Sequence, residues 1–244
     1  MPPPPTFTVR LKATKVLAPQ VRELAFERVG ETPLEFQAGQ WINLVLPLDP
    51  VIKRAYSIAS PPRGDGTFEL AITHVQGGPG STYLHGLEPG ATLEAMGPSG
   101  FFTGPKAAAH PCLFVATGTG ITPLRSILLD ELARGNTAPM RLLCGVRKSA
   151  DRLYQDELSA LAQAHPNFSF AYTLSQPEAG WTGLTGYVQT HLAQDWHTLA
   201  AAAPQGAPPH AYICGLQRMV GAVRDLLRKD LGAERQQVHS ERYD

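Results

Sequence analysis

The chain of 244 residues has few cysteines, no excess charge of either sign and no long hydrophobic run. Its three cysteines, Cys112, Cys144 and Cys214, lie in apolar segments without close pairing. This argues against a disulfide framework and is typical of a reducing compartment. There is no Cys-x-x-Cys run, so neither an iron–sulfur cluster nor a metal site is expected. The formal net charge of +0 argues against a nucleic-acid partner, which would require a basic excess.

The N-terminus lacks the features of a signal peptide. Met-Pro-Pro-Pro-Pro has neither a basic region nor an apolar core and predicts an extended, frayed tail. No apolar stretch approaches the roughly 20 residues needed to span a bilayer. We therefore expect a cytoplasmic monomer with no integral membrane segment.

The first hundred residues alternate between short β-rich segments and turns. Six strands and one short helix, from about Ser81 to Leu87, predict a compact six-stranded antiparallel β-barrel. The expected strands are Phe7–Leu17, Val21–Val29, Trp41–Leu48, Arg54–Ser60, Phe68–Val75 and Thr92–Met96.

The pattern changes near Gly104–Pro111, after which apolar strands alternate with amphipathic helices. This alternation indicates right-handed βαβ units and a parallel sheet. The expected strands are Cys112–Thr117, Arg141–Val146, Phe168–Leu174, Tyr212–Cys214 and Gln236–His239. The expected helices are Thr122–Arg134, Ala150–His165, Thr185–Trp196 and Arg218–Leu231, with a surface loop at Thr198–Pro209.

These two patterns predict two domains, 1–106 and 107–244. A barrel followed by an α/β domain of the nucleotide-binding type suggests that two ligands meet at the domain junction.

Residues 54–60 carry a cation, an aromatic ring and a hydroxyl along one expected strand. Alternation places Arg54, Tyr56 and Ile58 on one face and Ala55, Ser57 and Ala59 on the other. Arg54 can pair with a phosphate, Tyr56 can lie against a flat ring, and Ser57 can bond the edge of that ring. The set suits a dinucleotide flavin. The alternative is an exposed edge strand that happens to carry Arg and Tyr.

Two glycine turns offer anion sites at helix starts. In the first, Gly118 and Gly120 follow an apolar strand, Thr122 is the expected N-cap and Pro123 the first helical residue. The third glycine of the dinucleotide fingerprint is missing, so a purely structural corner remains open. In the second turn, Gly77–Gly80 precede Ser81 and Thr82, expected at a helix N-terminus. The alternative for this turn is an ordinary glycine-rich hairpin loop without a ligand.

The order of these motifs resembles that of the ferredoxin–NADP(H) reductase family over nearly the whole chain. The motifs are Arg-x-Tyr-Ser at 54–57, Gly-x-x-Ser at 78–81, Gly-Thr-Gly-Ile-Thr-Pro at 118–123, Cys-Gly at 214–215 and Glu-x-Tyr at 241–243. The resemblance implies FAD on the barrel and NAD(P)H on the α/β domain.

The resemblance also implies a set of FAD-binding residues. Arg54 would contact the pyrophosphate, Tyr56 would stack on the flavin and Ser57 would lie near its N5. Residues 71–74 would flank the ribityl-phosphate, and Ser81 and Thr82 would cap the pyrophosphate. The full set is Arg54, Ala55, Tyr56, Ser57, Ala71, Ile72, Thr73, His74, Gly80, Ser81, Thr82, Thr119 and Tyr243.

For the reaction centre, the resemblance implies Ser57, Cys214, Glu241 and Tyr243 as catalytic residues. Tyr243 would cover the flavin face until nicotinamide displaces it, although Asp244 extends the chain one residue beyond the aromatic. Simpler alternatives stay open: Cys214 as an ordinary buried cysteine, Glu241 as part of a solvated tail, and Tyr243 as a loose chain end.

The nucleotide site would contain Gly118, Thr119 and Gly120 together with Cys214 and Gly215. Its selectivity would depend on residues that follow the next two strands: Arg147, Lys148, Ser175 and Gln176. Cations in place of an acid favour the 2′-phosphate of NADPH. Many NADPH-specific relatives carry arginine at the position of Gln176, so NADH stays open, and Arg147 and Lys148 are alternatively plain surface charges.

A flavin can divide a hydride into single electrons, so a ferredoxin or flavodoxin is the expected partner. Lys53, Arg63 and Lys106 are candidate contacts for such an acidic carrier. Two other hypotheses remain. One is an NADH-dependent reductase component of an oxygenase, or a flavin reductase. The other is a non-enzymatic flavin-binding regulatory subunit.

Overall fold

The computed structural model describes residues 5–105, 110–203 and 207–243. The polyproline start, the predicted boundary at residues 106 and 107, the middle of the Thr198–Pro209 loop and Asp244 lie outside these ranges. Internal contacts divide the chain into two compact units. The first consists of Met1–Gly104 with Arg125–Asp130, and the second of Pro105–Leu124 with Glu131–Asp244.

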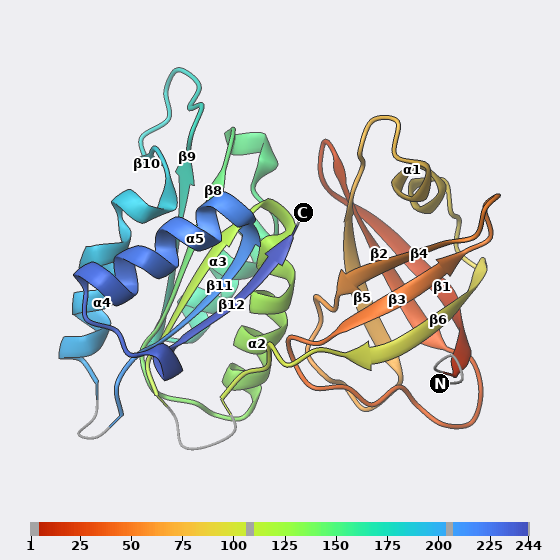
Figure 1. The fold of residues 1–244 in the computed structure, drawn as a ribbon, viewed down its shortest axis with the longest axis horizontal. Coiled ribbons are helices and arrows are strands. Elements are labelled where there is room, and N and C mark those ends of the chain that lie inside the picture. The colour runs from red at the N-terminus through yellow and green to blue at the C-terminus, as the bar shows by residue number, and fades with distance from the viewer. Residues whose placement is uncertain (1–4, 106–109, 204–206, 244) are drawn as a thin grey trace. The chain divides into compact units, whose positions relative to one another are not determined.

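The first unit is built on a six-stranded antiparallel sheet in the order β4-β3-β6-β1-β2-β5 (Figure 1). Ala59, just after β4, donates its N–H to Glu69 O in β5 at 2.8 Å, so the two edge strands meet. The predicted antiparallel fold is thereby confirmed. The strands are β1 Thr6–Ala18, β2 Val21–Arg28, β3 Trp41–Leu46, β4 Ile52–Ser57, β5 Thr67–Thr73 and β6 Thr92–Ser99.

Alternating side chains of these strands enclose the first core. In β3, Ile42, Leu44 and Leu46 are fully buried, while the residues between them are half-buried. The same cluster includes Phe26 and Phe68, whose rings stack with centroids 5.7 Å apart. Period-two patterning thus fixes which face of each strand turns inward. One correction concerns β4, which ends at Ser57. The predicted strand continued to Ser60. In the structure Ile58–Ser60 lie outside the strand, although all three residues are fully buried.

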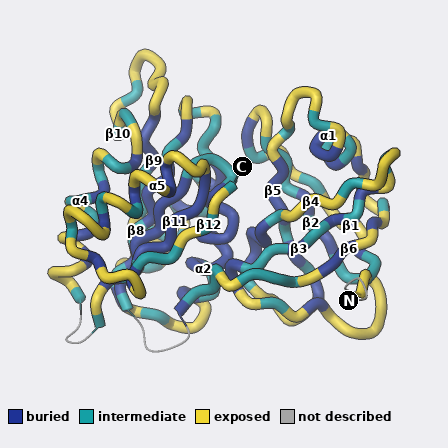
Figure 2. The backbone as a smooth tube through the Cα atoms, viewed as in Figure 1, coloured by how far each residue is buried: buried dark blue, intermediate teal, exposed yellow. Residues whose placement is uncertain are grey.

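The second unit is a six-stranded sheet in the order β10-β9-β8-β7-β11-β12, with every pairing parallel. Figure 2 shows long buried stretches along β8 and β11, as expected for a sheet covered by helices on both faces. The predicted α/β fold is confirmed. The strands are β7 Cys112–Thr117, β8 Met140–Val146, β9 Phe168–Leu174, β10 Leu184–Thr185, β11 His210–Leu216 and β12 Val238–Tyr243.

The helices are α1 Pro79–His85 in the first unit, and α2 Ile121–Ala133, α3 Gln155–Ala164, α4 Leu192–Ala201 and α5 Gln217–Asp225 along the rest of the chain. A π-helical turn, Leu226–Asp230, follows α5. In the part of the chain that the structure describes, no helix is both long and apolar enough to cross a membrane.

The predicted helices and the predicted loop differ from the structure in several places. The helix expected at Ala150–His165 starts only at Gln155, because Tyr154 has a left-handed backbone (φ 61°) that interrupts it. The helix expected at Thr185–Trp196 is instead the short strand β10, a 3-10 turn and then α4. Since α4 continues to Ala201, residues 198–201 are helical and the predicted loop begins too early.

Several strands differ from their predicted bounds, and the largest differences in the second unit are at β11 and β12. β11 extends beyond Tyr212–Cys214 at both ends, because it is hydrogen-bonded to β7 on one side and β12 on the other. The last strand, expected at Gln236–His239, begins at Val238 after a 3-10 turn, in which the backbone N–H of Glu234 donates to the Gln237 side chain at 2.7 Å.

Candidate functional site

The parallel sheet changes its direction of growth between β7 and β11. From β7 the chain adds β8 and β9 on one side, and later β11 and β12 on the other. Ligands of open parallel sheets bind beyond the carboxyl ends of the strands at such a switch point. In this protein the residues at that point are the 3-10 turn Gly118–Gly120 and the end of β11 at Cys214–Leu216.

Two glycines let this turn lie directly against β11. A Cβ atom on Gly120 would be 2.2 Å from the carbonyl O of Cys214, and one on Gly215 would be 2.2 Å from Thr117 Oγ1. Neither position therefore admits a side chain. Gly118, with φ +52°, faces open space, since no described atom beyond its two chain neighbours lies within 4 Å of its would-be Cβ. The turn thus exposes backbone to a ligand, as the phosphate-binding prediction requires.

Thr122 anchors the C-terminal aromatic residue. Its hydroxyl donates to Thr119 O at 2.9 Å and lies 3.1 Å from the hydroxyl of Tyr243. Tyr243 ends β12, paired with Leu216, so the alternative of a loose chain end is wrong. The predicted N-cap is also wrong: α2 begins at Ile121, and Thr122 lies within its first turn with its hydroxyl on a carbonyl.

Glu241 lies beside Cys214 in the ladder between β11 and β12. Burial raises the pKa of Glu241 to about 7. Its Oε2 atom is buried and has no hydrogen-bond partner among the described residues, which rules out the solvated-tail alternative. Burial and the neighbouring Glu241 raise the pKa of the Cys214 thiol, opposed by a hydrogen bond from Tyr243. A neutral thiol therefore neighbours an unsatisfied carboxyl oxygen, a polar atom that a ligand could satisfy.

The residues expected to select the nucleotide lie together beyond β8 and β9. Ser175 N–H donates to Val146 O at 3.0 Å, and Gln176 N–H donates to Arg147 O at 2.9 Å. All four residues at this edge of the sheet, Arg147, Lys148, Ser175 and Gln176, are exposed. The structure thus brings the predicted set together, at the strand ends where a nucleotide's ribose is held in such sheets.

In the first unit, Arg54 and Tyr56 share one face of β4. They pair across the ladder with the fully buried Leu44 and Ile42. Arg54 is exposed, whereas Tyr56 is half-buried against the first core. Burial raises the pKa of Tyr56, and the nearby Arg54 charge partly opposes this. Ser57, on the other face, is 5% exposed.

The glycine turn before α1 lies next to this strand. Gly80, in the first turn of α1, packs against it: a Cβ atom there would be 3.1 Å from Leu46 Cδ1 and 3.5 Å from Arg54 Cγ. Ser81 is not at the helix start as predicted, because α1 begins at Pro79, whose fixed φ suits a first turn. The Ser81 hydroxyl accepts from Val75 N–H at 3.0 Å and donates to Gly78 O at 3.1 Å.

The predicted segment 71–74 runs along the end of β5 toward α1. Ala71 and Ile72 are buried, Thr73 is exposed and His74 is half-buried. His74 Nε2 lies 3.5 Å from the Thr82 hydroxyl. The barrel members of the predicted flavin set therefore occupy β4, β5 and α1, while Thr119 and Tyr243 belong to the second unit.

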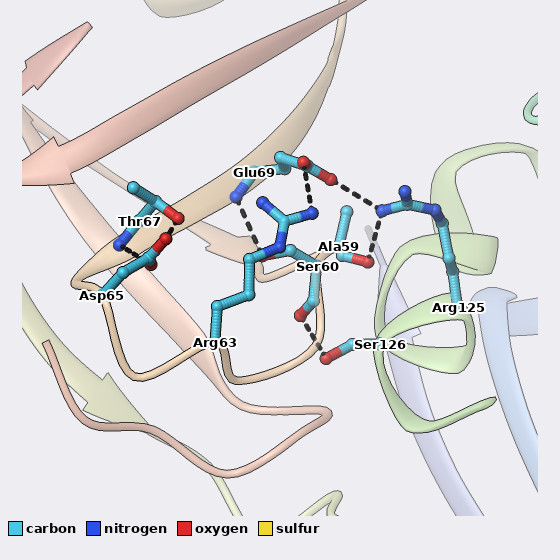
Figure 3. Close-up of polar contacts among 8 residues, drawn as sticks. All are labelled: Ala59, Ser60, Arg63, Asp65, Thr67, Glu69, Arg125 and Ser126. Atoms are coloured by element: carbon cyan, nitrogen blue, oxygen red, sulfur yellow. Dashed lines mark hydrogen bonds and ion pairs between the residues drawn. The ribbon is translucent and has the colours of Figure 1, made fainter. Parts of the chain in front are cut away.

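An ion-pair network that the sequence did not reveal holds the chain just after Ser57 (Figure 3). Arg125 donates to Glu69 Oε2 and to Ala59 O, both at 2.8 Å. Arg63 donates to Glu69 Oε1 at 2.7 Å, and Ser126 donates to Ser60 O at 2.6 Å. Burial alone raises the pKa of Glu69, but the charges and hydrogen bonds of the two arginines outweigh it and lower the pKa.

Comparisons with known proteins agree with this arrangement. The family model "Oxidoreductase FAD-binding domain" matches residues 8–103, and "Oxidoreductase NAD-binding domain" matches residues 114–225. The chain is 52% identical over 239 residues to "Ferredoxin--NADP reductase B" of Sorangium cellulosum, covering 98% of both chains. It is 32% identical to the "Phenol hydroxylase P5 protein" of Acinetobacter pittii, covering 94% of this chain but 63% of that protein.

Solved structures share the fold. The cytochrome P450 reductase GcoB of Amycolatopsis is 28% identical with a TM-score of 0.84, covering 98% of this chain and 70% of that one. A ferredoxin NADP+ reductase from Neisseria gonorrhoeae, solved with bound FAD and NADP, is 24% identical with a TM-score of 0.81, covering 97% and 98%. The second likeness shows the fold alone.

Fold and sequence together define an oxidoreductase with one FAD-binding and one NAD-binding domain. The chain belongs to the ferredoxin–NADP(H) reductase family. The residues present fit an FAD: Arg54 offers an exposed cation for a pyrophosphate, Tyr56 offers a half-buried flat ring, and the start of α1 at Gly80 lies close beside Arg54.

Proposed function

We propose that this enzyme uses a bound FAD to move electrons between NADP(H) and a ferredoxin or flavodoxin. The observation that carries the proposal is the 52% identity, over 98% of both chains, to a protein named ferredoxin–NADP reductase. The switch-point glycines and the unsatisfied Glu241 oxygen support it, because they leave exposed backbone and an available polar atom where a nucleotide would bind.

On the first unit, Arg54 would pair with the pyrophosphate of FAD and Tyr56 would pack on the flavin ring, with Ser57 at its edge. Ala55, the 71–74 segment and Gly80–Thr82 would complete the cradle. Bound flavin supplies the exchange between one hydride and two single electrons. The protein's own task is to fix orientation and exclude water, since hydride transfer is chiefly a positioning problem.

On the second unit, Gly118–Gly120 and Gly215 would hold the nicotinamide nucleotide. Cys214 and Glu241 would border its reacting ring, and Glu241 Oε2 would gain the hydrogen bond that it lacks. Tyr243 would have to leave Thr122, to which it is hydrogen-bonded, to make room. The role of Tyr243 as a shield for the flavin stays a prediction, and so does the predicted contact of Thr119 with FAD.

Replacing Tyr243 by serine tests the displacement. The variant should bind NADP+ more tightly and release it more slowly, because no aromatic ring competes for the nicotinamide position. Titration of NADP+ into the holoenzyme measures the affinity, and Tyr187→Ser, at an exposed tyrosine in the same unit, is the matched control. An unchanged affinity in Tyr243→Ser would contradict the proposed gate.

We favour NADPH over NADH as the physiological nucleotide. Arg147 and Lys148 are exposed beyond β8, and Ser175 is held beside them by the β8–β9 pairing. Cations there favour a 2′-phosphate. The carrier would dock through basic residues: Lys53 is exposed, Arg63 is paired with Glu69, and Lys106 lies outside the described residues.

We propose a cytoplasmic location and a monomeric state. All three cysteines are free and buried, as expected in a reducing compartment. Light scattering of the purified holoenzyme should give the mass of one chain, and the mass of a dimer would contradict the monomer.

A second candidate function is the NADH-dependent reductase component of an oxygenase. It is favoured by the relatives named phenol hydroxylase P5 protein and phenol 2-monooxygenase reductase component, at 32% and 36% identity. This chain spans only 63% and 57% of those proteins. A flavin reductase remains a related alternative.

Anaerobic mixing of the purified protein with each nucleotide, followed by turnover with a panel of carriers, separates these functions. We expect a yellow protein that NADPH bleaches faster than NADH and that reduces ferredoxin or flavodoxin. Bleaching by NADH alone would favour the oxygenase component. A colourless protein that takes up no flavin would refute both.

A further inference from the structure

A carboxylate lies at the edge of the sheet where the nucleotide's ribose is expected. The Ser149 hydroxyl donates a short hydrogen bond to Glu178 Oε1, and Ser149 N–H donates to Glu178 Oε2 at 3.4 Å. Ser149 follows Arg147 and Lys148 beyond β8, and Glu178 follows Ser175 and Gln176 beyond β9. Both oxygens of one carboxylate therefore face two donors of one serine.

The loop that carries Glu178 is firmly held. Trp181 N–H donates to Glu178 O at 3.1 Å and closes a turn, and Trp181 Nε1 donates to Leu184 O at 2.9 Å. A Cβ atom on Gly183 would be 2.4 Å from the Trp181 ring, so the indole packs directly on the backbone. The backbone of Glu178 is thus fixed. Rotation of the Glu178 side chain alone is enough to release Ser149 for another hydrogen-bond acceptor.

The opposite side of this contact is also held. Arg152 Nε donates to Ser149 O at 2.9 Å, and its guanidinium lies 5.3 Å from the centroid of the Trp181 ring. Arg147 and Lys148 precede Ser149, and one acid, Asp151, accepts from Lys148 N–H at 3.0 Å, so cations outnumber acids around the two donors. Two donors among cations form a position that suits an anion, and Glu178 fills it.

We propose that Glu178 sets the choice between NADPH and NADH by occupying the position on Ser149 that a 2′-phosphate would take. The inference rests on the proposed function, since it concerns the nucleotide of that reaction. NADPH has to displace the carboxylate and then lie near its negative charge. NADH has no phosphate to place there, and its ribose hydroxyls can donate to Glu178. Glu178 therefore opposes the preference that the neighbouring cations create.

The direction of the effect follows from charge. A phosphate monoester carries about −1.5 to −2 charges near pH 7, so one fixed negative charge beside it weakens binding. Neutralising Glu178 removes that repulsion for NADPH and weakens an acceptor for NADH, and both effects shift selectivity toward NADPH. We expect about a tenfold rise in the ratio of kcat/KM for NADPH to that for NADH.

The test compares Glu178→Gln with Asp156→Asn in the holoenzyme, using ferricyanide as electron acceptor. Asp156 is an exposed acid in the first turn of α3, so its replacement removes the same charge from the same unit without touching Ser149. Calorimetric titration with 2′,5′-ADP and 5′-AMP gives a second readout that needs no electron transfer. Glu178→Gln should bind 2′,5′-ADP about tenfold more tightly and leave 5′-AMP binding within about twofold.

A third variant, Ser149→Ala, checks that the serine is the shared partner. In that background Glu178→Gln should give a much smaller gain for 2′,5′-ADP. An unchanged ratio in Glu178→Gln, or an equal shift in Asp156→Asn, would overturn the inference while leaving the proposed function intact. Failure of every variant and of the wild type to bind either nucleotide fragment would instead refute the nucleotide site, and the inference with it.

Discussion

At the scale of residues, two positions stand out: Gly120, which packs against the backbone of β11, and Glu241, whose carboxyl group is buried. The hydrogen of Gly120 is the largest substituent that the contact with Cys214 O allows. Burial raises the pKa of the Glu241 carboxyl to about 7, so a large share of it stays protonated near neutral pH, next to a neutral thiol. Each feature makes a measurable prediction for stability that is independent of the proposed reaction.

Replacing Gly120 by alanine should lower the free energy of unfolding by about 1–3 kcal/mol, as overpacking typically does. The new Cβ would lie 2.2 Å from Cys214 O, so the turn or β11 has to move. Gly221→Ala in α5 is the control: no described atom lies within 4 Å of its would-be Cβ, and a gain of about 0.5–1 kcal/mol is expected. Urea unfolding measures both, and a Gly120→Ala variant as stable as the wild type would contradict the contact.

The raised pKa of Glu241 predicts a stability that falls as pH rises. Below the unfolded pKa, about 4.3, both states are protonated. Between there and pH 7 the unfolded chain ionises first, so folding is progressively disfavoured until the folded pKa of about 7 is passed. Discounted for partial exposure, the loss should be about 1–2 kcal/mol. Unfolding at pH 5 and pH 8 should show this loss in the wild type but not in Glu241→Gln; equal losses would contradict it.

At the scale of elements, two residues of α2 hold the segment that follows β4. Arg125 bonds Ala59 O and Glu69 of β5, and Ser126 bonds Ser60 O. Arg125 is 6% exposed and donates to both Ala59 O and Glu69 Oε2, so a carbonyl and a carboxylate stabilise its buried charge. The network fixes the backbone that follows Tyr56 and Ser57, the residues predicted to touch the flavin.

Glu69→Gln should cost about 3 kcal/mol at pH 7, because it removes the carboxylate that pairs with the buried Arg125 at 2.8 Å. Since the pKa of Glu69 is lowered by folding, its stabilisation is present above about pH 4.3 and is lost as pH falls through the folded pKa. The difference between variant and wild type should therefore shrink in acid. Asp225→Asn, which breaks the exposed Lys229 pair, should cost under about 1 kcal/mol. Similar costs for the two variants would contradict the network.

Elements were predictable wherever the local pattern was decisive. β7 and β9 have the predicted bounds, because continuous apolar runs between turn residues leave little choice. The start of α3 was not predictable, because it depends on the left-handed backbone of Tyr154. The end of β12 depends on pairing with β11, a contact that no local window contains.

At the scale of the whole molecule, the sequence indicated which glycines need close backbone contacts, but it did not indicate which side chains pair with each other. Gly118, Gly120 and Gly215 were found because glycine carries a backbone requirement that can be read locally. Glu69–Arg125 and Ser149–Glu178 were not, because the partners are 56 and 29 residues apart and acids and cations are common on surfaces.

The central claim is that this chain passes a hydride from NADPH to an FAD that it holds. The most direct test is single-turnover reduction of the anaerobic holoenzyme with NADPH carrying protium or deuterium at the transferred position of C4. The account predicts that the yellow absorption bleaches in one turnover and that deuterium slows the bleaching. A bound flavin that stays oxidised with both NADPH and NADH would contradict it.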